Sequence, residues 1–272
     1  ELTGGAAGPP ARGHGSPGGG GSVGWQMLGS ADVLALDNHT EGLVGGAGRP
    51  GGGAVGASVV DAQRLGMEGV GWGRLAGGAA AGCSEGQDAC HEGFAYGVSL
   101  VSSTSVRATR LLVHDLSGRQ VLGAWWSEGS LLGDLRNATL YGLLGDESAV
   151  AVLVHEEASL TVLDSIVVNS NGDGLANAGP VASNLSVSYS DVWGHDGLRV
   201  HNVEEGEEML NVNPRFLSAG TGDFRLRRAS PVVDAGHPDS PCDAEAVPGD
   251  GGPCRPDLGF FGGTAQGLSR VR

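Results

Sequence analysis

The sequence predicts an all-β fold, built as a parallel β-solenoid that ends in a disulfide-bearing C-terminal cap. A repeat of 25 to 29 residues runs through the middle of the chain, and an antiparallel sandwich would show frequent turns without such a fixed frame. Glycine accounts for 51 of 272 residues and interrupts most of the sequence, which helices tolerate badly. Four cysteines form two pairs that are each local in sequence.

The repeat is clearest between "SLTVLDSIVVNSNGDG" (159–174) and "NLSVSYSDVWGHDG" (184–197), which match at an offset of 25 residues. Two inward apolar residues, a small residue at a corner and another apolar residue are what one coil needs, and stacked coils bury equivalent positions on one another. The anchors of this frame are Val60, Val106, Leu135, Val162 and Val187. Their spacings are 46, 29, 27 and 25 residues, so the first covers either two coils or one coil with an inserted loop.

The frame divides the chain into three parts. Residues 1–22 are mostly Gly, Pro, Ala and Ser and predict a flexible leader. Residues 23–236 would form the coils, with degenerate early coils and a loop insertion around 75–97. Residues 237–272 would form the cap and tail. In "GDFRLRRASPVVDAG" (222–236), Phe224 and Leu226 alternate with Arg225 and Arg227, which predicts a half-buried last strand before the cap.

The cysteines favour an oxidising compartment. Three pairings can be drawn, and the sequence-local one joins Cys83 to Cys90 and Cys242 to Cys254. The spacings do not fit Cys-x2-Cys zinc pairs. Two local disulfides would indicate export, and free thiols in a cytosolic protein are the alternative.

The formal net charge of −15 makes nucleic acid and anionic membranes poor partners. The longest compact apolar run, 149–154, is far too short to span a membrane. No signal peptide follows Glu1, as expected of a mature form or a fragment.

Three stretches carry a family resemblance: "YSDVWG" (189–194), "NVNPRFLSAGTGDFRLRRASPVVDAGHP" (211–238) and "RPDLGFFGG" (255–263). They resemble the C-terminal end of secreted right-handed parallel β-helix proteins of the pectin-lyase-like, choice-of-anchor type found in bacterial exoproteomes. Asn213-Pro214-Arg215-Phe216 replaces the family's Asp-Pro-Leu-Phe, and a Cys-bounded loop replaces its aspartate-rich stretch. The resemblance implies a right-handed β-helix and export, and it assigns no activity.

Four arginines are the candidate ligand-binding residues. In the repeat frame Arg107 and Arg136 occupy one outward position on adjacent coils, and Arg64 and Arg110 share another. Coils about 4.8 Å apart would place their guanidinium groups where they can grip the carboxylates of a linear acidic glycan. The alternative is a solvated face whose arginines pair with Asp61 and Asp134.

A polysaccharide lyase or epimerase would need a base beside a cation that holds the uronate carboxylate. The chain contains no lysine, so the base would be Arg, His or Tyr, with Tyr141 and Tyr189 as outward candidates. His114-Asp115 and His195-Asp196 share a register in this frame but lie three coils, or about 14 Å, apart. No catalytic residue is assigned.

Two weaker patterns complete the candidates. Asp239, Asp243, Glu245 and Asp250 in the acidic Cys-bounded loop could supply oxygens to Ca²⁺, the one cofactor expected, without the EF-hand spacing; a solvated loop is the alternative. Asn38, Asn137 and Asn184 begin Asn-x-Ser/Thr sequons, which could carry glycans if the host is eukaryotic.

These features predict a secreted or cell-surface module with a non-catalytic binding or structural role towards extracellular polysaccharide. The alternatives are a lyase or epimerase acting on an acidic glycan, and a self-assembling subunit of an extracellular fibre.

Overall fold

The structure is a computed structural model that describes residues 21–29, 32–45, 52–78, 93–127, 129–130, 132–179, 184–241 and 255–262. The described residues form an all-β fold without an α-helix. Sixteen of their strands belong to one extensive parallel sheet, and two more form a separate antiparallel pair. None of the described helical segments is long and apolar enough to cross a membrane.

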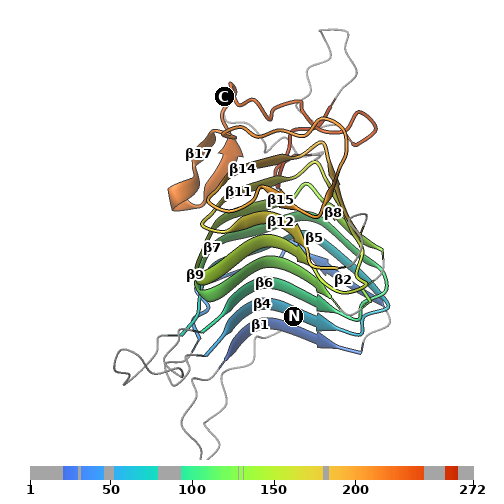
Figure 1. Ribbon diagram of the computed structural model, residues 1–272, viewed down its shortest axis with the longest axis vertical. Helices are drawn as coiled ribbons and strands as arrows, with labels where there is room; N and C mark the ends of the chain where they lie inside the picture. The colour runs from blue at the N-terminus through green and yellow to red at the C-terminus, as the bar shows by residue number, and fades with distance from the viewer. Residues whose placement is uncertain are drawn as a thin grey trace, which may run out of the picture.

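The parallel strands stack in three ladders, and the chain passes through ladders 1, 2 and 3 in turn (Figure 1). Ladder 1 contains β1 (Ser22–Leu28), β4 (Ala54–Val60), β6 (Ala95–Val101), the end of β7 (Val106–Ser127), the end of β9 (Thr139–Val154), β12 (Asp173–Asn177) and β15 (Val200–His201). Ladder 2 contains β2 (Asp32–Leu36), the start of β5 (Arg64–Ala76), the start of β7, β8 (Gly133–Arg136), β10 (Leu160–Leu163), β13 (Leu185–Ser188) and β16 (Glu204–Glu205). Ladder 3 contains β3 (His39–Glu41), later parts of β5 and β7, the start of β9, β11 (Ile166–Ser170) and β14 (Asp191–His195).

The predicted repeat is confirmed from Leu135 onward. Val162 pairs with Leu135 on one side and Val187 on the other, and all three side chains are at most 1% exposed. Equivalent positions thus stack as inward columns of Val and Leu, which bury apolar surface at every level of the ladders.

The early part of the predicted frame is wrong. Val106 pairs with Leu65 and Gly133, and Ala108 is the residue in the Leu135 column. Val60 belongs to ladder 1, where it pairs with Val101. Because side chains alternate with a period of two, a two-residue slip keeps the inward face inward, so the apolar pattern alone did not reveal the error. The direct pairing of β5 with β7 shows that one turn separates them.

Each corner between ladders is turned by a residue with a left-handed backbone. At the corner between ladders 2 and 3, the φ angles are 43° at Asp37, 65° at Gly69, 55° at Arg110, 49° at Asn137 and 51° at Asp164.

A small residue follows the left-handed residue at the later turns of this corner. The backbone N–H of Ala138 donates to the hydroxyl of Ser165 (3.1 Å), and the N–H of Ser165 donates to the hydroxyl of Ser190 (3.1 Å). The small corner residues predicted from the repeat therefore also link one turn to the next.

The C-terminal stretch 222–236 is half-buried, as predicted, since Phe224 and Leu226 are each 2% exposed while Arg227 is exposed. It does not form a coil strand, however. β18 (Asp223–Leu226) pairs antiparallel with β17 (Phe216–Ser218) around a 3-10 turn (Ala219–Thr221). The placement of residues up to 236 in the coils is therefore corrected, because alternation of period two is common to parallel and antiparallel strands.

This hairpin and the segments after it lie along the side of the ladders near their C-terminal end (Figure 1). The ring of Phe224 lies 5.0 Å from that of His114 and 5.2 Å from that of Tyr141, both in ladder 3. Further along, the backbone N–H of His237 (2.6 Å) and the hydroxyl of Ser240 (2.5 Å) donate to the carboxylate of Asp164 at the corner. The C-terminal segment thus covers ladder 3 laterally.

Several predictions fall outside the described residues. These are the leader up to residue 20, most of the insertion around 75–97, Cys83, Cys90, Cys242 and Cys254, and the acidic residues Asp243, Glu245 and Asp250. The disulfide pairing and the calcium loop stay predictions.

The inward columns predict a sharp contrast between neighbouring positions. Val162→Asp should unfold the protein or lower its melting temperature severely, because a buried carboxylate would have no partner in a Val/Leu column. Thr161→Asp should change it little, since Thr161 is exposed. Thermal denaturation followed by circular dichroism measures both, and equal melting temperatures would contradict the column assignment.

Candidate functional site

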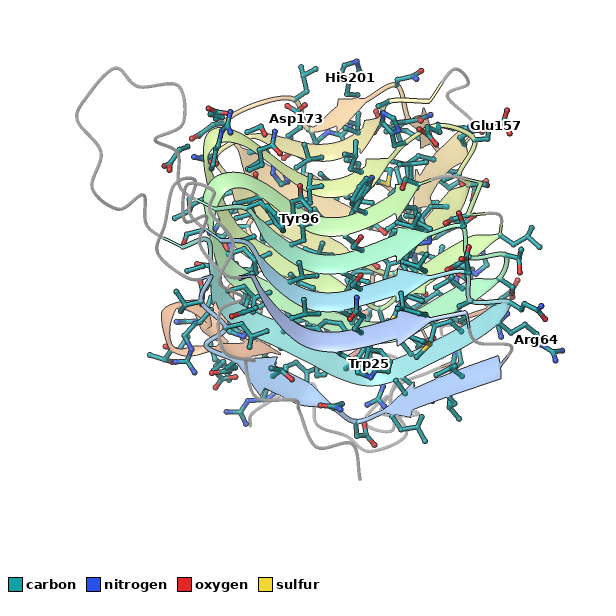
Figure 2. All side chains as sticks on the ribbon, turned by 90° about the horizontal axis from the view of Figure 1, so that it is seen from below. Trp25, Arg64, Tyr96, Glu157, Asp173 and His201 are labelled. Carbon is teal, nitrogen blue, oxygen red and sulfur yellow. The ribbon has the colours of Figure 1, made fainter. Side chains whose placement is uncertain are left out.

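Ladder 2 carries a groove on its outer side that includes three of the four predicted arginines. It has a volume of about 820 Å³ and is lined by Arg64, Arg107 and Arg136 together with Leu34, Gly66 and Asp134, among others. Figure 2 shows Arg64 projecting outward from the edge of this ladder. Gly66 lies between Leu34 and Arg107 in one outward column, so its missing side chain leaves the space between them.

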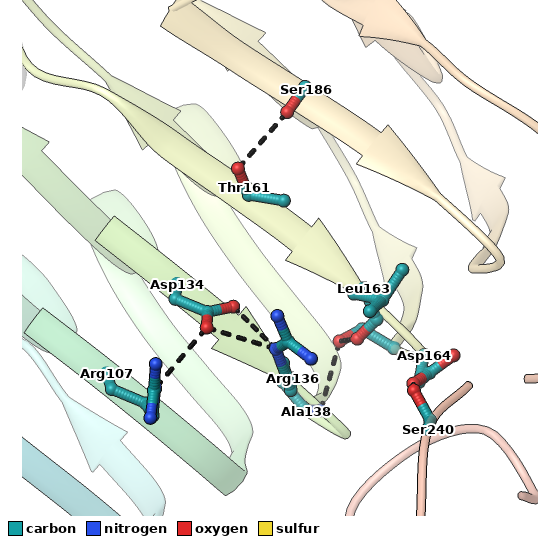
Figure 3. A network of polar contacts seen from close by, with 10 residues as sticks. Arg107, Asp134, Arg136, Ala138, Thr161, Leu163, Asp164, Ser186 and Ser240 are labelled. Atoms are coloured by element: carbon teal, nitrogen blue, oxygen red, sulfur yellow. Dashed lines mark hydrogen bonds and ion pairs between the residues drawn. The ribbon is translucent and has the colours of Figure 1, made fainter. Parts of the chain in front are cut away.

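Asp134 is the centre of the charged network in this groove (Figure 3). The Nε of Arg136 donates to both carboxylate oxygens of Asp134, at 2.9 and 3.0 Å. The Nε of Arg107 lies 3.4 Å from Oδ2 of the same carboxylate. Both contacts use Nε, so these bonds do not occupy the terminal guanidinium nitrogens. The Arg107 side chain is 75% exposed, whereas that of Asp134 is 19% exposed.

The arrangement of the arginines differs from the predicted rows. Arg107 pairs in register with Asp134, and Arg136 pairs with Thr109, because the frame at Val106 was two residues off. The two arginines still share a face, since a two-residue slip does not change the face.

Arg110 is not a groove residue. It turns the corner between ladders 2 and 3, with its guanidinium 3.3 Å from Glu68 and 3.6 Å from Asp37. The structure thus brings together Arg64, Arg107 and Arg136, and separates Arg110 from them. Of the two predicted acidic partners, Asp134 forms ion pairs with the groove arginines.

The tyrosines considered for a lyase do not line the groove. Tyr141 packs in ladder 3 against the rings of Phe216 and Phe224. Tyr189 is 8% exposed at the corner, and its hydroxyl donates to Glu207 at 2.7 Å. That hydrogen bond is the main cause of the raised pKa of Tyr189. Nor do the two histidine-aspartate pairs share a register, because His114 and Trp193 occupy the same column while His195 pairs with Ser170.

A second polar cluster, which the sequence analysis missed, lies on the outer side of ladder 3. The Nε2 of His39 lies 2.8 Å from Oε1 of Glu41, and the Nε2 of His114 lies 3.8 Å from the same oxygen. Burial lowers the pKa of His39, and the nearby His114 and Arg74 lower it further. The His39-x-Glu41 alternation in a strand is the signal that could have indicated it, although nothing in the spacing joins it to His114.

The sequons and the one described residue of the calcium loop have mixed environments. Asn137 is buried (5% exposed) and its side chain approaches the backbone of Asp257, so the folded protein has no room for a glycan there. Asn38 is exposed and Asn184 is half-buried. Asp239 is exposed.

Two buried carboxyl groups have raised pKa values. Burial raises the pKa of Asp164, while Ser240 and His237 partly offset this. Burial raises the pKa of Asp191 to about 7, against one hydrogen bond from the backbone N–H of Val212 at 3.0 Å. Oδ2 of Asp191 is buried without a hydrogen-bond partner among the described residues. A protonated Asp191 therefore suits its surroundings at mildly acidic pH.

Comparison with known proteins adds no relatives: no family model, no curated protein and no solved structure matches this chain.

The raised pKa of Asp191 predicts a pH-dependent stability. The folded state binds the extra proton between about pH 4 and pH 7, so the free energy of unfolding should fall as pH rises across that range, by at most about 4 kcal/mol from this group. Asp191→Asn keeps the acceptor for Val212 and should lessen that fall, being more stable than the wild type at pH 8. Urea unfolding at pH 5 and pH 8 measures it. The control Asp239→Asn, at an exposed site, should leave the slope unchanged, and an identical slope in Asp191→Asn would contradict the assignment.

Proposed function

We propose that this protein is a secreted or cell-surface right-handed parallel β-helix that binds an acidic polysaccharide, without catalysis, through the groove on ladder 2. The observation that carries the proposal is the pair of arginines, Arg107 and Arg136, held around the single carboxylate of Asp134. Asp134 occupies the position that a ligand carboxylate would take.

Three parallel ladders visited in a fixed order favour a closed helical coil. The right-handed sense follows from the strong preference of parallel crossover connections for that hand. The resemblance at 189–194, 211–238 and 255–263 points in the same direction, to exported β-helix proteins.

The energetics of the groove favour ligand exchange. An exposed ion pair contributes only about 0–1 kcal/mol to stability, so a ligand carboxylate can displace Asp134 at small cost. Guanidinium groups bind carboxylates through two parallel hydrogen bonds. A row of sugars crossing several turns would meet Arg64, Arg107 and Arg136 in one hollow.

The competing lyase or epimerase function is less well supported. A lyase needs its base within hydrogen-bonding reach of the proton that it removes. Tyr141 is packed against the C-terminal hairpin and Tyr189 is hydrogen-bonded to Glu207 at a corner, and neither lines the groove beside the arginines.

The proposal predicts opposite effects for substitutions on the two sides of the ion pairs. Arg107→Ala with Arg136→Ala should weaken binding of an acidic glycan by about tenfold or more, because two charge-assisted contacts are lost. Asp134→Asn should strengthen binding about threefold or more, since the competing carboxylate is neutralised. A glycan-array screen identifies the ligand, and calorimetry at two salt concentrations measures the affinities.

The matched control is Arg119→Ala with Arg199→Ala. These arginines also pair with carboxylates, those of Glu147 and Glu205, but they do not line the groove. The control removes the same charge and should leave the affinity nearly unchanged. Equal losses in both double variants would reduce the effect to net charge. Release of unsaturated sugar from the same ligands would instead support a lyase.

A further inference from the structure

The cluster on ladder 3 exists because glycines occupy the turn between its members. Glu41, Gly73 and His114 follow one another in a single outward column, and His39 and Gly71 are neighbours in the next. Adjacent turns are about 4.8 Å apart, so His114 is two turns away from Glu41. A Cβ at Gly73 would lie 2.2 Å from Nε2 of His114, and one at Gly71 would lie 2.4 Å from the ring of His39. The missing side chains thus let the two histidines lean towards each other.

The hydrogen bonding of His114 directs a nitrogen lone pair into the cluster. Its Nδ1 lies 2.9 Å from Oδ2 of Asp115, and an ionised carboxylate only accepts, so Nδ1 carries the hydrogen. In the neutral ring Nε2 is then an acceptor, and it faces the acceptor Oε1 of Glu41 at 3.8 Å. Two acceptors facing each other in a site where His114 is 3% exposed require a positive species between them.

We propose that His39, Glu41 and His114 form a binding site for a divalent metal ion of the zinc type. Among the described residues these are the side chains whose ligand atoms all lie within 4.8 Å of one another. Tetrahedral ligands at zinc distances are about 3.3 Å apart, and the contacts of Glu41 with the two histidines, 2.8 and 3.8 Å, bracket that value.

The surroundings match those of known zinc ligands. Two histidines and one glutamate leave a fourth position for water or a ligand, and the 45% exposed side chain of His39 places the open side towards solvent. The hydrogen bond from His114 to Asp115 is the carboxylate-histidine contact that orients metal-binding imidazoles. On the other side the ring of Phe224, 5.0 Å away, shields His114.

Arg74 is the charge that opposes a cation here. It pairs with Oε2 of Glu41, leaving Oε1 for the histidines. Its side chain is 67% exposed, so it can move away or remain bound to the outer oxygen. Imidazole ligands select zinc-type ions over Ca²⁺ and Mg²⁺, which prefer oxygen. The site is distinct from the arginine groove on ladder 2, so the two proposals stand or fall separately.

Titration of the metal-free protein with Zn²⁺ by calorimetry, and with Co²⁺ by visible absorption, tests the site. One ion should bind per chain, with a Co²⁺ spectrum typical of nitrogen and oxygen ligands, and should raise the melting temperature. His39→Ala and Glu41→Gln should each abolish this binding. Asp115→Asn should weaken it about tenfold or more through loss of the orienting contact. Arg74→Gln should strengthen it a few-fold.

Two further variants separate ligand loss from misfolding. Gly73→Ala keeps all three ligands but displaces His114, so it should weaken binding while the circular dichroism spectrum stays that of the wild type. His155→Ala removes another histidine paired with a carboxylate, that of Glu156, and should have no effect. Zn²⁺ binding that survives His39→Ala and Glu41→Gln, sulfur-to-cobalt charge transfer from the cysteines, or equal affinity for Ca²⁺ would overturn the proposal.

Discussion

The left-handed residue at each corner is the constraint on which the rest of the structure depends. It ends one strand and redirects the chain into the next ladder, and its recurrence at every turn keeps equivalent positions in register. Asp, Asn and Gly tolerate this backbone, whereas other residues adopt it at a cost of about 1–2 kcal/mol. Arg110 and Tyr189 adopt it nevertheless, with φ of 55° and 44°. Both are tied down, Arg110 by Glu68 and Tyr189 by Glu207.

Because turns stack in register, the outer surface is organised as columns as regular as the core. A side chain's neighbours are the residues one turn before and one turn after it, not those adjacent in sequence. Glycine in such a column removes one level and creates a hollow that the flanking side chains share. Gly66 does this beside Arg107, and Gly73 does it between Glu41 and His114. The two candidate sites therefore have the same structural origin on different ladders.

Much of the fold could be predicted from sequence, because Leu, Val and Ser recur at one offset from Leu135 onward. The frame failed at Val106, where alternation of period two fits equally well two residues away, and at Val60, which belongs to another ladder. The antiparallel hairpin failed for a related reason, since Phe224 and Leu226 alternate as they would in a coil strand. The groove arginines were found because a two-residue slip preserves the face. The histidine cluster was not found, because His39 precedes the first anchor of the frame and its partner is two turns away.

The distribution of charge resolves an apparent conflict between an acidic protein and an acidic ligand. The formal net charge is −15, which disfavours a partner of high charge density. At physiological ionic strength, however, charges more than about 8 Å apart are largely screened. A ligand carboxylate inside the groove is then governed by the guanidinium groups within a few ångströms of it and by the competing Asp134. A sparsely charged polymer, with one carboxylate every sugar or two, meets these local groups without carrying the charge density that the whole surface repels.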